Sequence, residues 1–177
     1  MPDGIKGNRA AVAETIANNV RRKIIKEHLN DPAYYDRMSA LLREILDDLR
    51  ARRIDYETFL KRIAEVAKQV QSGHADDTPE PLKRSPALRA LYHNLQPSPA
   101  TEPGDHLADG PGKYRVEDDP VLKLAETIDE TVRRTSPDGW RGVQTREQVI
   151  KGELFKILKD ADQVERIFLI IKAQREY

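Results

Sequence analysis

The strongest constraint on the fold is a run of eight apolar residues between positions 34 and 49 that recur every three or four residues. This spacing puts them on one face of an α-helix, in a pattern close to a heptad seam. Asp31 and Pro32 precede the run, and a carboxylate cap followed by proline is typical of a helix start. The inner face of the predicted helix consists of Tyr34, Tyr35, Met38, Leu41, Leu42, Ile45, Leu46 and Leu49.

Two further helices are predicted on either side of this one. The apolar stripe of the first consists of Val12, Ile16, Val20 and Ile24, and Ala13 and Ile25 widen it. In the third, Asp55 is placed to cap the amide of Glu57 or Thr58, and Ile54 with Phe59 forms a hydrophobic staple. The short connection predicts an antiparallel hairpin of the second and third helices, which completes a bundle with the first. In that hairpin Met38, Leu41, Leu42, Ile45 and Leu49 are expected to face Phe59, Ile63, Val66 and Val70.

After a loop predicted at 71–83, the rest of the chain is expected to be helical on both sides of one stretch rich in proline and glycine. Ser85-Pro86 starts a short helix and Asp119-Pro120 starts another. Residues 96–118 between them have the composition of a flexible linker or insertion. We therefore expect an N-terminal helical bundle over 1–95, a linker over 96–118, and C-terminal helices over 119–177 that pack on the bundle.

Two more helix starts complete the prediction. Thr145 and Gln148 have capping-box spacing, and Asp160 or Asp162 precedes the last apolar run. No segment alternates with a period of two, and only 6% of the residues are aromatic, so leucine, isoleucine and valine must supply most of the core. The expected fold is an all-α bundle of about six to seven helices.

Composition limits the kinds of partner and compartment. Thirty basic and thirty acidic residues cancel, whereas a domain that holds DNA over a broad face normally has a basic excess. The chain has no cysteine, which excludes disulfides and thiolate metal sites and fits a reducing cytoplasm. No apolar run approaches the length of a membrane span. We expect a cytoplasmic protein with no membrane partner.

Known catalytic patterns are missing. The only Gly-Lys pair, Gly112-Lys113, is followed by Tyr114 where a phosphate-binding loop needs serine or threonine. No acidic residue stands two positions before a lysine, as a metal-dependent nuclease motif requires. The histidines are scattered without metal-ligand spacing. The sequence therefore predicts no catalytic, cofactor-binding or metal-ligating residue.

Two groups of side chains remain as candidate contacts. Arg21, Arg22 and Lys26 could touch phosphates, or they could be solvated cations that favour the C-terminal end of a helix dipole. Asn18 and Asn19 have poor helix propensity, so they either face solvent or bind a partner segment.

A third candidate lies in a glycine-flanked loop. Trp140 and Arg141 are of the residue types most enriched at interface hot spots, and a loop is expected to present them outward. The alternative is that the tryptophan fills the gap between two helix ends.

Five blocks along the chain carry a resemblance to a known family. They are IANNVRRKIIKE at 16–27, NDPAYYDRMSALL at 30–42, ALRALYHNL at 87–95, DGWRG at 138–142 and AQREY at 173–177. In this order they resemble the C-terminal helical region of the R (motor) subunit of type I restriction-modification enzymes. The resemblance runs from about Arg9 to Tyr177. Gly4–Lys6 leads directly into the first predicted helix, as expected of a segment of a longer chain.

The resemblance implies a noncatalytic role for this segment. The parent subunit would be an ATP-dependent type I site-specific deoxyribonuclease that also uses Mg²⁺ and S-adenosylmethionine, none of which is expected to bind here. The segment would follow the motor domains and dock them to the methyltransferase core of M and S subunits. The alternative is a helical module that contacts DNA beside the motor. A continuous Lys/Arg stripe would favour the alternative, and a mixed surface with exposed apolar groups would favour protein docking.

Overall fold

The computed structural model describes residues 3–75, 78–96 and 119–177, with side chains from Ala11 onward. Within these residues the chain forms eight helices and no strand. The all-α class predicted from the apolar spacing is confirmed, and the eight helices are close to the six to seven expected. The predicted linker at 96–118 lies outside the described residues except for Gln96.

The helices fall into two compact units. The N-terminal unit comprises Met1–His28 and Pro32–Asp76, and the C-terminal unit comprises Leu29–Asp31 and Asp77–Tyr177. The division near Asp76 differs from the boundary predicted at 95/96. The physical reason is that the short helix after Pro86 buries its apolar face, including Leu91, in the core of the C-terminal unit. The packing of residues 119–177 on the first bundle stays a prediction.

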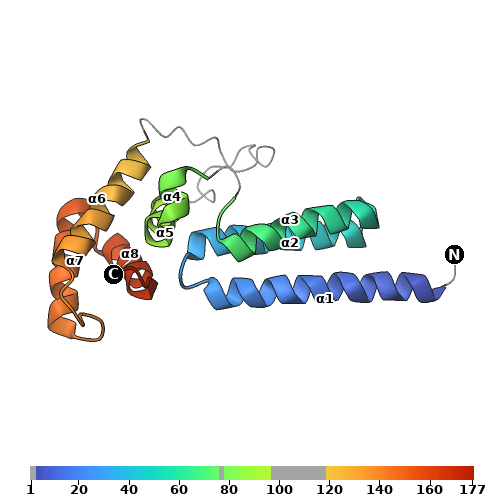
Figure 1. Ribbon diagram of the computed structural model, residues 1–177, viewed down its shortest axis with the longest axis horizontal. Helices are drawn as coiled ribbons and strands as arrows, with labels where there is room; N and C mark the ends of the chain where they lie inside the picture. The colour runs from blue at the N-terminus through green and yellow to red at the C-terminus, as the bar shows by residue number, and fades with distance from the viewer. Residues whose placement is uncertain (1–2, 76–77, 97–118) are drawn as a thin grey trace. The chain divides into compact units, whose positions relative to one another are not determined.

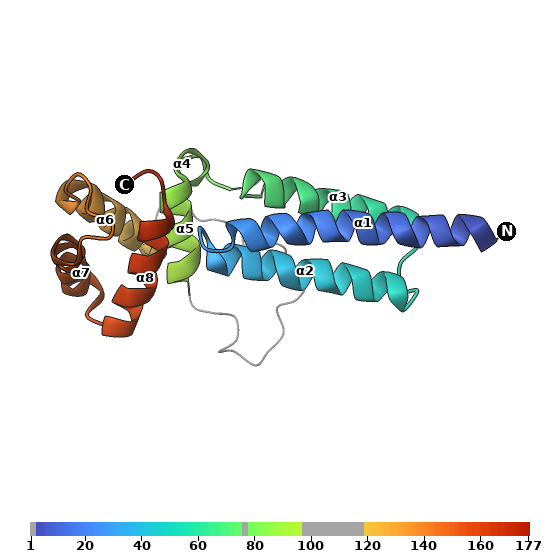
Figure 2. The same cartoon turned by 90° about the horizontal axis from the view of Figure 1, so that it is seen from below.

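Three long helices make the N-terminal unit, and Figures 1 and 2 show them running side by side. They are α1 (Asp3–Glu27), α2 (Pro32–Arg50) and α3 (Tyr56–Ser72). Each of the three contacts the other two. Their inner stripes merge into one cluster in which the Phe59 ring is fully buried. This arrangement is the three-helix bundle that the periodicity predicts.

The α2–α3 hairpin is antiparallel, as predicted. At one end the Tyr34 hydroxyl, early in α2, donates a hydrogen bond to the Gln69 carbonyl, late in α3, at 3.0 Å. At the other end Arg62 Nη1 lies 2.9 Å from Asp48 Oδ2. The nine predicted contact residues all belong to, or pack against, the same apolar cluster.

Local signals fix both ends of α3. Asp55 accepts a hydrogen bond from the Thr58 amide at 2.7 Å, and this bond holds the pKa of the carboxyl below its ordinary value. Ile54 packs against the cluster that contains Phe59, as a hydrophobic staple requires. The helix ends at Gly73, whose φ of 74° lies in the left-handed region where glycine is favoured.

The C-terminal unit consists of five helices around a second core. They are α4 (Glu80–Arg84), α5 (Pro86–Leu95), α6 (Pro120–Thr135), α7 (Gln144–Leu158) and α8 (Ala161–Ala173). Contacts run from α5 to α6, α6 to α7 and α7 to α8, and α8 returns to α5. The four longer helices thus close around one apolar cluster.

Three helix starts of this unit test the predicted caps. Asp119 caps α6 and Asp160 caps α8, each by accepting hydrogen bonds from backbone amides of the first turn. The capping box predicted at Thr145 and Gln148 is wrong, because α7 begins at Gln144 after Val143, which makes no side-chain cap bond. The Glu147 carboxylate instead accepts from the Gly142 amide at 2.8 Å, one residue earlier than the spacing suggests.

The last residues of the chain tie several of these helices together. The Glu176 carboxylate accepts hydrogen bonds from the Ser85 hydroxyl at 2.7 Å and from the Ala87 amide at 3.2 Å, at the start of α5. It also accepts from Arg133 on α6 at 3.1 Å. Burial and a hydrogen bond to Asp129 raise the pKa of the Tyr177 hydroxyl far above its ordinary value. The Glu176 carboxylate therefore links the N-terminal end of α5 to α6.

A buried charge should break the hairpin. Leu42 is 3% exposed, so Leu42→Asp would put a carboxylate among apolar side chains and should lower the free energy of unfolding by about 3 kcal/mol or more. Ala40→Asp adds the same group at an exposed position of the same helix and should cost less than about 1 kcal/mol. Urea unfolding followed by circular dichroism measures both. Equal losses would contradict the packing of α2 against α3.

Acid should weaken the C-terminal unit through Asp119. Burial raises the pKa of this carboxyl, but hydrogen bonds from the Tyr92 hydroxyl and from the amides of Val121 and Leu122 lower it more, to a net value below 3.8. A pKa lowered by folding gives stability that is present above 3.8 and is lost as the pH falls through the folded value. Asp119→Asn, which cannot ionise, should therefore show a smaller fall in thermal midpoint between pH 5 and about 2.5. An unchanged pH profile would refute the assignment.

Candidate docking surface

The exposed face of α1 carries five of the seven side chains singled out in the sequence. The buried stripe of the helix consists of Ala13, Ala17, Val20 and Ile24. The prediction that Val12 and Ile25 belong to this stripe is wrong, because they are 41% and 69% exposed and the two alanines take the inner positions instead. All five candidates lie outside this stripe and are exposed: Asn18, Asn19, Arg21, Arg22 and Lys26. The amide pair proposed for a partner and the cations proposed for DNA thus share one helix face between residues 18 and 26. We call these five residues together with Ile25 the α1 face.

The α1 face has cations without carboxylate partners. Arg21 donates a hydrogen bond to the Asn18 amide oxygen at 2.9 Å, and Lys23, at the edge of the face, pairs with Glu27 at 2.9 Å. Among the described residues no carboxylate lies within ion-pair distance of Arg22 or Lys26. The N-terminal unit as a whole has 14 Lys and Arg against 11 Asp and Glu, a net charge of +3.

The face is not purely cationic. Ile25 is 69% exposed and lies between Arg21 and Arg22 around the helix, since it follows them by four and three residues. Covering an exposed isoleucine with another apolar group is favourable by about 25 cal/mol for each Å² of apolar surface removed from water. The α1 face is therefore a mixed surface of cations, amides and one apolar side chain.

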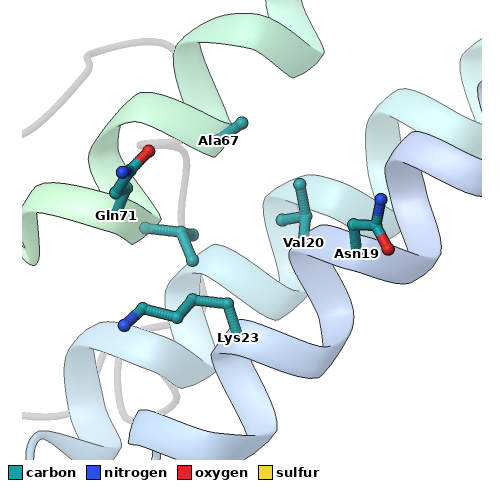
Figure 3. Close-up of a pocket in the computed structure, with 6 residues that line it drawn as sticks. Asn19, Val20, Lys23, Ala67 and Gln71 are labelled. Carbon is teal, nitrogen blue, oxygen red and sulfur yellow. The ribbon is translucent and has the colours of Figure 1, made fainter.

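An open groove borders this face where α1 meets α3. It has a volume of about 360 Å³ and is lined by Asn19, Val20, Lys23, Ala67, Val70 and Gln71. Figure 3 shows Asn19, Val20 and Lys23 on one helix, with Ala67 and Gln71 on the other. Val20 and Val70 line the groove as almost completely buried side chains, 6% and 1% exposed, and Ala67 is half-buried. The other three side chains supply one ammonium group and two amides. The groove can accept an apolar side chain and hydrogen-bond the polar groups beside it.

The remaining candidates, Trp140 and Arg141, lie in the C-terminal unit and are not a docking pair of the expected kind. Trp140 is only 2% exposed, and its ring centroid lies 5.7 Å from that of Phe168. The Arg141 guanidinium stacks over the indole at 4.6 Å and donates to the carbonyls of Lys172 and Gln174. The expectation that the loop presents Trp140 outward is wrong, because the indole fills the core of this unit. The alternative, a tryptophan that fills a gap, describes the structure.

Sequence reasoning missed a buried polar cluster in the C-terminal unit. His93 is only 4% exposed, and its Nδ1 lies 2.6 Å from Asp31 Oδ2. The Asn94 amide donates to Asp31 Oδ1 at 2.9 Å and to the Ala90 carbonyl at 2.8 Å. These bonds satisfy polar groups that would be costly to bury alone. Sixty-two positions separate Asp31 from His93, and no local pattern in the sequence signals such a pair.

Comparison of the chain with protein-family models, with curated proteins and with solved structures gives no match. In the part of the chain that the structure describes, no three histidine, aspartate or glutamate side chains gather as a metal site would require. None of the helices described is both long and apolar enough to cross a membrane. Any function therefore has to be inferred from the surface of the two units and from the resemblance in the sequence.

The burial of Trp140 gives a direct test. Trp140→Ala should lower the free energy of unfolding by about 3–5 kcal/mol, because a large aromatic side chain leaves a cavity in the core. Val143→Ala, a truncation of a more exposed side chain a few residues further on, should cost less than about 1 kcal/mol. Chemical denaturation of the whole chain measures both changes. If Trp140→Ala lowers the free energy of unfolding by less than about 1 kcal/mol, the indole is not a core side chain and is again a candidate surface contact.

Proposed function

We propose that this chain is a noncatalytic assembly domain of a type I restriction enzyme R subunit, and that it docks the motor to the methyltransferase core of M and S subunits. The five sequence blocks that resemble the C-terminal region of that subunit support the family. The α1 face supports the mode of action, because it combines an exposed isoleucine with cations that have no carboxylate partner among the described residues. The groove borders this face at Asn19, whereas Ile25 lies on the side of α1 away from the groove. The cations and the exposed isoleucine together are the observation on which the proposal rests.

The mixed character of the face favours a protein over DNA. Protein interfaces bring apolar and polar groups together in one patch, with arginine among the enriched residue types. A phosphate backbone would neutralise Arg21, Arg22 and Lys26, but it offers no apolar group to cover Ile25 or to fill the groove over Val70. Docking on a protein would use both parts of the surface.

DNA contact is the second candidate, and the three exposed cations of α1 are the observation that favours it. If Arg21, Arg22 and Lys26 each neutralised one phosphate, log Kd would change with log salt by a slope of only about 3. Such binding would be weak at physiological salt. The proposal therefore assigns DNA an indirect role, through the motor domains of the same subunit.

The proposal also covers the chemistry of the parent enzyme. ATP hydrolysis, translocation and cleavage belong to the motor and nuclease domains, and methyl transfer belongs to the M subunit. This domain would bind neither ATP, Mg²⁺ nor S-adenosylmethionine, and it would act in the cytoplasm. Its expected isolated activity in ATPase, nuclease and methyltransferase assays is zero.

Charge reversal on α1 tests the docking role. The whole chain should form a complex with the cognate methyltransferase core on size exclusion, and Arg22→Glu/Lys26→Glu should raise the Kd at least tenfold. Both side chains are exposed, so the free energy of unfolding should change by less than about 1 kcal/mol. Arg37→Glu/Arg43→Glu makes the same charge change at exposed positions of α2 and should leave the Kd within twofold.

Two results would contradict the proposal. The first is no complex between the unmodified chain and the methyltransferase core. The second is tight binding of duplex DNA that both double variants weaken equally, which would indicate that the net charge of the unit matters and the α1 face does not. In the second case the DNA-contacting candidate would replace docking.

A further inference from the structure

We propose that the groove between α1 and α3 receives an acidic amphipathic segment of the partner protein. The inference rests on the proposed function and adds the chemistry of the docking element. Its apolar side chains would lie over the half-buried Ala67, where α1 meets α3, and its carboxylates would face the cations of α1. Neither the sequence blocks nor the comparisons assign any ligand to this groove.

The shape of the groove favours side chains of an extended partner over a small molecule. Its volume of about 360 Å³ is near the lower limit of pockets that enclose small ligands, which hold roughly 300–1,000 Å³. It is also open along the line where the two helices meet. An open apolar depression between two helices is the kind of surface on which an amphipathic helix places its apolar residues.

The charges beside the groove set the sign of the segment. Asn19, Lys23 and Lys26 follow one another at intervals of four and three residues, so they form one row along α1, and Arg22 lies next to it. Asn19 and Lys23 are themselves groove residues, so the row follows the rim. Lys23 is partly neutralised by Glu27, whereas Arg22 and Lys26 are not neutralised by any carboxylate of the described residues.

Charge complementarity therefore selects an acidic segment. The N-terminal unit carries a net charge of +3, so a basic segment would be repelled from the row and an acidic one attracted. The amides of Asn19 and Gln71, on opposite helices, can donate to carboxylates or to free backbone carbonyls of the segment. DNA shares the negative charge but has no apolar side chain for the groove.

Designed probes test the inference on the whole chain. The first is an 18-residue amphipathic peptide of glutamate, leucine and alanine; the second has lysine in place of glutamate; the third is a 16-base-pair DNA duplex. Titration of the ¹⁵N-labelled chain should show that the acidic peptide shifts the amide signals of Val20, Ala67 and Gln71. The lysine peptide should bind at least tenfold more weakly.

Variants separate the two parts of the surface. Ala67→Leu fills the groove without a change of charge and should weaken the acidic peptide at least tenfold, whereas Ala40→Leu on α2 should leave its Kd within twofold. Arg22→Glu/Lys26→Glu should invert the preference, so that the lysine peptide binds more tightly than the acidic one. Binding of the acidic peptide that is indifferent to Ala67→Leu would overturn the groove as its site.

The methyltransferase core distinguishes failure of this inference from failure of the proposed function. Support requires that the acidic peptide compete with the core and that Ala67→Leu weaken the core at least tenfold. If the core binds the unmodified chain but neither effect occurs, docking stands and the groove inference fails. If the core does not bind at all, the proposed function fails as well. If the duplex displaces the acidic peptide at equal or lower concentration, the surface is a DNA contact and the inference is overturned.

Discussion

Burial of the apolar seam between α2 and α3 is the interaction on which the N-terminal unit depends. Each helix exposes one continuous stripe, and neither stripe can be removed from water unless the helices turn back on each other. Phe59, Ile63 and Ile45 are almost completely buried in that seam. The buried stripe of α1 completes the apolar core of the bundle. Ile25 lies outside the stripe and is left for solvent or a partner.

The extent of this stripe explains why the candidate surface lies on α1. The helix buries Ala13, Ala17, Val20 and Ile24, two of which are alanines, so the helix backbones can approach closely along that stripe. At the α3 side the small Ala67 lines an open groove. This groove lies next to cations that pair with no carboxylate of the described residues, and a complementary partner would contact both parts together.

In the C-terminal unit, hydrogen bonds between buried polar groups help to select the arrangement of the helices. His93, Asp31 and Asn94 bond one another in the interior, and Glu176 joins the start of α5 to Arg133 of α6. Buried polar groups contribute little net stability, but each is expensive to leave without a partner. They therefore select one arrangement of the helices over other apolar packings. Trp140 belongs to this unit as a core residue, with its ring tilted against that of Phe168 and the Arg141 guanidinium over the indole.

The sequence by itself determined the longer helices and the α2–α3 hairpin, because apolar periodicity and N-caps act within a few residues. It did not predict α4, and it placed Val12 and Ile25 of α1 in the buried stripe, although both are exposed. It also set the signs of charge that make an acidic partner the complement of Arg22 and Lys26. Only the tertiary structure decided the division near Asp76, the burial of Trp140, the His93–Asp31 pair and the groove beside Ala67. These features depend on which side chains meet across long separations in the chain. A loop tryptophan looks the same in the sequence whether it faces water or fills a gap, and the space available between helices decides which.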